Sequence, residues 1–206
     1  MEKDIKISFH NYGFRSFITI NLCQECPRQD NKGCCGLYSP VFYPMDFAYW
    51  LEKNPELINF ILNLPNITIL DSSITVNSPR DGDSYRCPMH NFESGCLLAQ
   101  KLRESICRHF VCPGVYWQDE LKLSRWKDFF EQIFDYEITI NNTIDARMRL
   151  ENLSLRVPEQ RNDCFEFMKK MVLELTASME NVFTALPQQE EFWIKRELVF
   201  GKQWLL

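Results

Sequence analysis

The chain has 206 residues, a hydrophobic fraction of 45% and a formal net charge of -5 at pH 7. This length and apolar content suffice for a single domain with a hydrophobic core. The acidic charge and the scattered Lys and Arg residues argue against a nucleic-acid partner, which requires a basic surface. Because no apolar run approaches the ~20 residues that span a bilayer and the first residues lack a signal-peptide pattern, we expect a cytoplasmic protein with no membrane partner.

The N-terminal part of the chain predicts strands followed by an irregular loop. Residues 5–22 mix β-branched and aromatic residues with polar ones, which favours one or two strands. Residues 23–35 read CQECPRQDNKGCC and contain turn-forming residues without helical or strand periodicity. We therefore expect a loop whose order depends on something other than apolar packing.

The next segment predicts two short helices, a hairpin and a turn. Each helix begins at a proline, a residue that fits the first helical position, and the helices should cover residues 44–54 and 55–64. Residues 67–77 alternate apolar and polar side chains around a polar centre, which predicts a hairpin. Residues 79–83 should form a surface turn.

The remaining elements are predicted to be helices. Apolar residues recur every four positions over residues 98–110, and residues 123–134 form a second amphipathic pattern. A third helix should begin at Asp163, in a capping-box-like start, and stop at Pro187. A final short helix is expected over residues 189–200.

These elements together predict an α+β fold within a single domain, residues 1–206. Residues 20–114 form the expected cysteine-cluster metal-binding region, a small lobe with short strands. It should pack on a mainly helical part, residues 115–206. The chain has only seven glycines and neither a dinucleotide-binding motif nor a P-loop, so a methyl-donor or nucleotide site would be atypical.

The strongest functional signal is the distribution of the nine cysteines. In a reducing compartment they remain thiols available to metal, which makes a disulfide framework the less favoured interpretation. Cys164 lies on the apolar stripe of a predicted helix and is expected to pack in the core. The other eight form two groups of four and are the predicted metal ligands: Cys23, Cys26, Cys34 and Cys35, then Cys87, Cys96, Cys107 and Cys112.

Four thiolates can complete a tetrahedral zinc site or hold the irons of an iron–sulfur cluster, and thiolate ligation alone does not separate the two. We favour an iron–sulfur cluster, for example 4Fe-4S, because a structural zinc site rarely needs eight cysteines. Zn remains the alternative cofactor. His90 and His109 flank predicted ligands and could replace a cysteine at zinc, but ordinary hydrogen bonding is the more frequent role of such histidines.

Two spacings constrain the ligand geometry. Neighbouring side chains on an extended segment point in opposite directions, so Cys34 and Cys35 should not easily bind one ion together. Cys107 and Cys112 can face one metal only if the helix ends between them. Basic residues close to the cysteines in sequence could offset the thiolate charge: Arg28, Lys32, Arg86, Arg103 and Arg108.

The cysteine array resembles the YkgJ-like cysteine-cluster family, which is described as a zinc- or iron-chelating domain with a CxxCxxCC motif. Three stretches carry the resemblance: the CxxC with the vicinal pair, the segment GLYSPVFYPMDFAYWL, and RCPMHNFESGCLLAQKLRESICRHF. The spacing from Cys26 to Cys34 is longer than in the simplest form of the motif, and Glu104 stands where the family usually has proline. The resemblance covers roughly residues 20–112.

The cysteines and the resemblance favour an iron–sulfur protein with a redox or electron-transfer role and an unidentified protein or redox partner. As an enzyme it would be an iron–sulfur oxidoreductase, and the sequence identifies no catalytic residue. One alternative is a non-catalytic, zinc-stabilised interaction module. Another is a methyl-transfer enzyme, because flagellin lysine N-methylases resemble this family in their cysteine-rich part.

Overall fold

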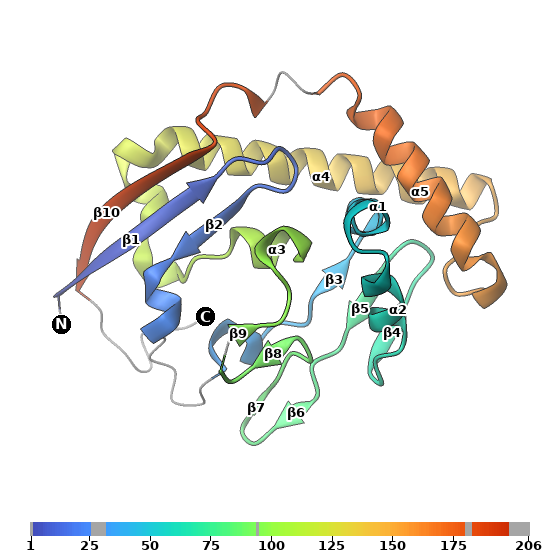
Figure 1. Ribbon diagram of the computed structural model, residues 1–206, viewed down its shortest axis with the longest axis horizontal. Helices are drawn as coiled ribbons and strands as arrows, with labels where there is room; N and C mark the ends of the chain where they lie inside the picture. The colour runs from blue at the N-terminus through green and yellow to red at the C-terminus, as the bar shows by residue number, and fades with distance from the viewer. Residues whose placement is uncertain (1, 26–31, 94, 180–182, 198–206) are drawn as a thin grey trace.

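A computed structural model describes residues 2–25, 32–93, 95–179 and 183–197 (Figure 1). The fold is mixed α+β, with small sheets and a largely helical second half, in agreement with the predicted class. One sheet lies at one end of the molecule, and a second sheet with two short helices lies at the other (Figure 1). In the described part of the chain, no helix is long and apolar enough to cross a membrane.

The first sheet is built on the N-terminal strand. β1 (Glu2–His10) lies between β2 (Phe17–Ile20) and β10 (Gln189–Glu197), and both partners are antiparallel to it. β1 and β2 confirm the strands predicted for residues 5–22.

The predicted helix at residues 189–200 is wrong, because its described part is the strand β10. Ile194 is buried and Phe192 packs partly buried against the core, whereas the Trp193 side chain between them is exposed. This period of two is typical of a strand that covers a core with one face. β10 pairs with β1 along nine residues, from Glu2↔Glu197 to His10↔Gln189.

The predicted helices and hairpin in the next segment are confirmed. α1 (Pro44–Lys53) begins at the expected proline, and α2 (Glu56–Leu62) follows it. β4 (Ile67–Ile69) and β5 (Ile74–Val76) form the antiparallel hairpin, and β3 (Val41–Phe42) pairs with the other edge of β5.

The cysteine region contains only short elements, and the helix predicted over residues 98–110 is mostly wrong. Arg103 and Glu104 are extended, with ψ of 156° and 168°, because the Glu104 carboxylate caps the helix that follows. The elements are η1 (Asn21–Glu25), η2 (Gly33–Gly36), β6 (Arg80–Asp81), β7 (Ser84–Tyr85), β8 (His90–Asn91), β9 (Gly95–Cys96), η3 (Gln100–Leu102) and α3 (Ser105–His109).

Two helices dominate the second half. α4 (Ser124–Leu150) is much longer than the predicted 123–134, because buried residues continue its apolar face through Ile144 and Met148. α5 (Arg161–Thr176) starts close to the expected position but ends well before Pro187. Short 3-10 turns complete the chain: η4 (Pro113–Val115), η5 (Trp117–Asp119), η6 (Leu121–Leu123) and η7 (Pro158–Gln160).

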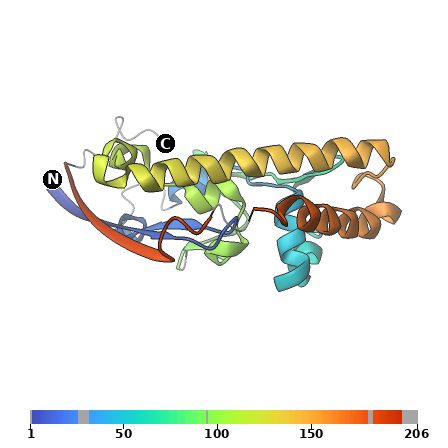
Figure 2. The ribbon, with the colours of Figure 1, turned by 90° about the horizontal axis from the view of Figure 1, so that it is seen from above.

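α4 packs against two separate hydrophobic cores and runs along the whole molecule (Figure 2). Its first half packs on the β10-β1-β2 sheet, where Trp126 stacks on Phe9 with ring centroids 5.0 Å apart. Its second half packs with α1 and α5 around Trp50 and Met168. One helix therefore holds the two cores together.

Between the two cores, Arg108 is fully buried and joins three segments. Its Nε donates to the carbonyl of Arg103 at 3.0 Å, and its Nη1 donates to the carbonyl of Ser16 at 2.8 Å. Its Nη2 donates to the carboxylate of Glu137 on α4. The start of β2, the segment before α3 and the middle of α4 are thus held by one guanidinium.

Arg15, also buried, binds the same segment. Its Nε donates to the carbonyl of Lys101 at 2.9 Å and its Nη2 to the carbonyl of Arg103 at 3.0 Å. Its Nη1 forms an ion pair with Asp46 of α1 at 2.9 Å. The Arg103 carbonyl consequently accepts hydrogen bonds from both buried guanidinium groups.

We expect Arg108→Met to lower the free energy of unfolding by about 3–5 kcal/mol, because it leaves the Glu137 carboxylate buried without its cation. Replacing both partners, in Arg108→Met/Glu137→Leu, should recover part of this loss. Urea unfolding followed by circular dichroism measures all three proteins.

Arg149→Met is the matched control, because Arg149 lies on the same helix as Glu137 and pairs with Asp145 while 67% exposed. It should change the free energy of unfolding by no more than about 0.5 kcal/mol. An Arg108→Met variant as stable as this control would show that the buried pair does not hold the segments together.

Candidate functional site

The first cysteine segment is the turn η2, which carries Cys34 and Cys35. It begins at Gly33, whose φ of +57° lies in the left-handed region that glycine adopts readily. The preceding Lys32 is buried, and its Nζ donates to the carbonyl of Asp81 and to the hydroxyl of Ser84. The turn is therefore attached to the β6–β7 hairpin.

The second segment carries Cys87 and Cys96 beside this turn. The backbone N–H of Cys87 donates to the carbonyl of Cys35 at 2.8 Å, which places the two residues next to each other. The Cys87 carbonyl then accepts from the N–H of His90, and His90 pairs with Cys96 across the β8–β9 hairpin. Backbone hydrogen bonds thus link three cysteines from two distant parts of the sequence.

The third segment is α3, which carries Cys107. The buried carboxylate of Glu104 caps this helix, accepting from the N–H of Cys107 at 2.6 Å and of Ile106 at 2.8 Å. Because the carbonyl of Arg103 binds both buried guanidinium groups, the start of α3 is held firmly.

The thiols of these segments are close enough to change each other's ionisation. A hydrogen bond with Cys34, burial and the charges of Cys34, Cys87 and Cys96 all raise the pKa of Cys35. Burial, the Glu104 carboxylate and then the charges of Cys34 and Cys96 raise the pKa of Cys107. Charges act on one another's ionisation in this way when they lie in the same neighbourhood of the fold. The structure therefore gathers five predicted ligands, which we call the thiol cluster: Cys34, Cys35, Cys87, Cys96 and Cys107.

The remaining cysteines occupy other places. Cys112 packs against the core beside the β10-β1-β2 sheet, and the exposed Cys23 follows Leu22, which is buried in that same core. Cys26 lies outside the described residues. Cys164 of α5 is fully buried in the core that this helix forms with α1, as its position on an apolar stripe predicts.

The two spacing arguments have different outcomes. Cys34 and Cys35 do not lie on an extended segment, and the 3-10 turn brings their thiols within hydrogen-bonding distance. The argument from an extended backbone therefore does not apply to this pair, and whether both thiols bind one ion stays a prediction. The predicted break between Cys107 and Cys112 is confirmed, because α3 ends at His109 and Phe110 is extended.

The sulfur atoms of the thiol cluster are suitable ligands for a thiophilic metal. In this structure they are not arranged closely enough to hold one. Within residues 2–25, 32–93, 95–179 and 183–197, no three Cys, His, Asp or Glu side chains are arranged to hold a metal ion. Several thiols that raise each other's pKa cannot all ionise unless a cation compensates their charge. The Arg103 guanidinium supplies part of this compensation, since it lowers the pKa of Cys34 after the larger effect of the Cys35 hydrogen bond.

Two residues beside the cluster were missed by sequence reasoning. Burial, opposed in part by a hydrogen bond from the Cys107 thiol, raises the pKa of Glu104 to about 7. Burial and the charges of Glu104 and Cys107 raise the pKa of Tyr38, which places its phenol near both groups. The sequence offered one signal for Glu104, which stands where the YkgJ-like family usually has proline, shortly before Cys107.

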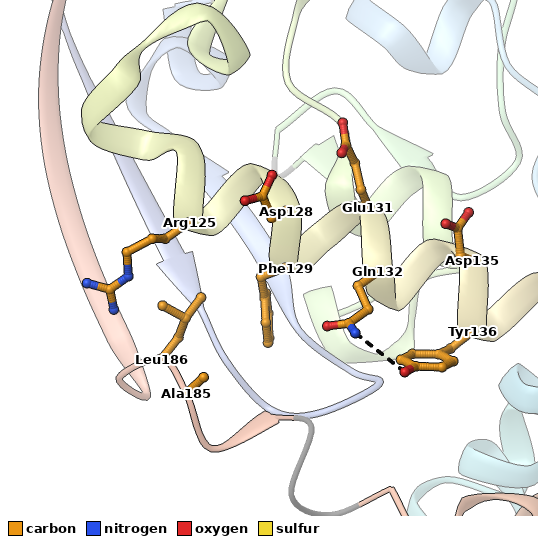
Figure 3. Close-up of a pocket in the computed structure, with 9 residues that line it drawn as sticks. All are labelled: Arg125, Asp128, Phe129, Glu131, Gln132, Asp135, Tyr136, Ala185 and Leu186. Atoms are coloured by element: carbon orange, nitrogen blue, oxygen red, sulfur yellow. Dashed lines mark hydrogen bonds between the residues drawn. The ribbon is translucent and has the colours of Figure 1, made fainter.

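A wider groove of about 720 Å³ on the outer side of α4 is a poorer candidate. Figure 3 shows Phe129 pointing toward the Ala185–Leu186 segment, whereas the carboxylates of Glu131 and Asp135 point away from it. The groove has no set of convergent polar groups of the kind that orients a ligand.

Comparisons with known proteins give no further guidance, because no family model, curated protein or solved structure matches this chain.

In the reduced, metal-free chain we expect iodoacetamide at pH 7 to alkylate Cys34 faster than Cys35 or Cys107. The hydrogen bond from Cys35 lowers the pKa of Cys34 to about 7, so about half of this thiol is the reactive thiolate at that pH. The pKa values of Cys35 and Cys107 are raised, so both remain protonated thiols. Peptide mass spectrometry over time measures the rates.

Cys35→Ala removes the hydrogen-bond donor and should slow alkylation of Cys34 at pH 7. Cys164→Ala, in the core, should leave the rate unchanged. Equal rates at Cys34 and Cys107 would contradict the arrangement of the cluster.

Proposed function

We propose that the chain is a cysteine-cluster metalloprotein whose thiol cluster holds an iron–sulfur cluster with a redox or electron-transfer role. The observation that carries this proposal is that five thiols from three separate segments lie in one neighbourhood of the fold. The motifs around these cysteines also support placing the chain near the YkgJ-like family.

In this proposal, Cys87, Cys96, Cys107 and one member of the vicinal pair provide the four thiolates, and the other member is a spare thiol. When bound, an iron–sulfur cluster supplies a one-electron redox couple. The chain's own residues would set the electrostatic environment, with Arg103 offsetting the thiolate charge near Cys34. Glu104 and the buried arginines hold α3 in place and so position Cys107. The partner would then be a redox protein that exchanges electrons with this centre.

Anaerobic purification followed by iron, sulfide and zinc analysis tests the proposal. We expect a brown protein with iron and acid-labile sulfide, and Cys87→Ser and Cys107→Ser should each lose at least half of the bound metal because each removes one ligand. Cys164→Ser is the matched control and should retain the wild-type metal content. Equal metal content in all four proteins would refute the ligand assignment, and a colourless wild type with stoichiometric zinc would refute the iron–sulfur cluster.

A zinc-stabilised interaction module is the second candidate, and the short elements of the cysteine region favour it. β6, β7, β8 and β9 have two residues each, and isolated hairpins of this size are unstable in water. A metal that joins the segments would supply the missing folding free energy. In this case the metal has a structural role only.

This second proposal predicts that complete zinc removal by a chelator unfolds the cysteine region while α4 and α5 remain helical. Hydrogen exchange measured by mass spectrometry should show loss of protection in peptides covering residues 77–112 and little change in residues 124–150. Unchanged exchange in the cysteine region after verified zinc loss would rule out a structural metal.

A further inference from the structure

A second, smaller pocket lies where the start of α1, the start of α3 and the middle of α4 meet. Its volume is about 290 Å³, close to the lower limit of pockets that bind small molecules. Its walls include Glu104, which also caps the helix of Cys107, but its other groups take no part in the thiol cluster.

The walls of this pocket are apolar and partly open to solvent. Four large side chains that line it are only half buried, between 41% and 43% exposed: Tyr43, Ile106, Phe134 and Ile138. Phe134 and Ile138 are one helical turn apart on α4, so both point to the same face. Half-exposed apolar groups gathered around a cavity are typical of a ligand site.

At the polar end of the pocket, two buried oxygens lack a hydrogen-bond partner among the residues that the structure describes. They are Oε2 of Glu137 and Oγ of Ser105. The Glu137 side chain is only 5% exposed, and its other carboxylate oxygen accepts from Arg108. A buried carboxylate oxygen without a donor is costly, which indicates that a group absent from the chain completes it.

The ion pairs around this end leave an acceptor unused. Asp46 and Glu137 line the pocket, where Asp46 pairs with the guanidinium group of Arg15 and Glu137 with that of Arg108. All three nitrogens of each guanidinium already donate to carbonyls or carboxylates, so neither has a nitrogen left without a partner. The group left without a donor is therefore a carboxylate oxygen, Oε2 of Glu137, which a charged donor satisfies better than a neutral one.

We propose that this pocket binds a small primary amine in its ammonium form. The ammonium group donates to Oε2 of Glu137 and to Oγ of Ser105. The alkyl chain lies against Phe134, Ile138 and Ile106. A neutral alcohol of the same shape lacks the positive charge and should bind more weakly. A carboxylate of the same length is negatively charged and should not bind.

Isothermal titration calorimetry of the full chain with n-butylammonium chloride tests this proposal. We expect saturable one-to-one binding, with n-butanol at least tenfold weaker and sodium butyrate not bound. The metal content of the same sample is determined separately, so a negative result here is distinct from a failure of the metal proposal. Absence of saturable binding, or equal binding of butanol, would overturn the proposal.

Two variants and a control locate the site. Ile138→Trp fills the pocket from a half-exposed position and should abolish butylammonium binding, whereas Leu150→Trp, on the same helix and 80% exposed, should leave it unchanged. Glu137→Gln removes the anionic acceptor and should weaken binding at least tenfold, with circular dichroism confirming that it folds. Because Ile138→Trp does not disturb the buried ion pair, unchanged binding in that variant would by itself refute the assignment.

Discussion

The structure depends on two buried guanidinium groups that donate to one backbone carbonyl, that of Arg103. A buried charge is tolerated only with a partner of opposite sign and with its remaining donors satisfied. Arg15 therefore requires Asp46 on α1, and Arg108 requires Glu137 on α4. These requirements tie the sheet, both helices and the segment before α3 into one arrangement that apolar packing, which is non-directional, would not specify by itself.

The same arrangement places two different chemical environments next to each other. On one side, Glu104 caps α3 and accepts from the Cys107 thiol, at the edge of the thiol cluster. On the other, Glu104 lines the small pocket with Glu137 and Ser105. Glu104 thus belongs to both environments, and the residue before it, Arg103, is held by the two buried arginines.

Local sequence signals were sufficient for the elements that depend on neighbouring residues. The proline at the start of α1 and the alternation across β4 and β5 predicted those elements correctly. β10 was missed because its partner, β1, lies at the other end of the chain, and only that pairing explains its conformation. The grouping of the thiols was equally hidden, since it depends on a backbone hydrogen bond between Cys87 and Cys35. Glu137 carried no sequence signal, because its role depends on its burial against Arg108.

The pairing of β1 with β10 also has a consequence for synthesis of the chain. β1 is synthesised before its nine-residue partner, which follows only after α4 and α5 have been made. Until then, one edge of β1 has unpaired N–H and C=O groups, and its apolar face with Ile5, Ile7 and Phe9 is incompletely covered. Such long-range pairing slows folding. Until β10 is made, this strand is therefore exposed to aggregation, and a chaperone that covers extended apolar segments would act there.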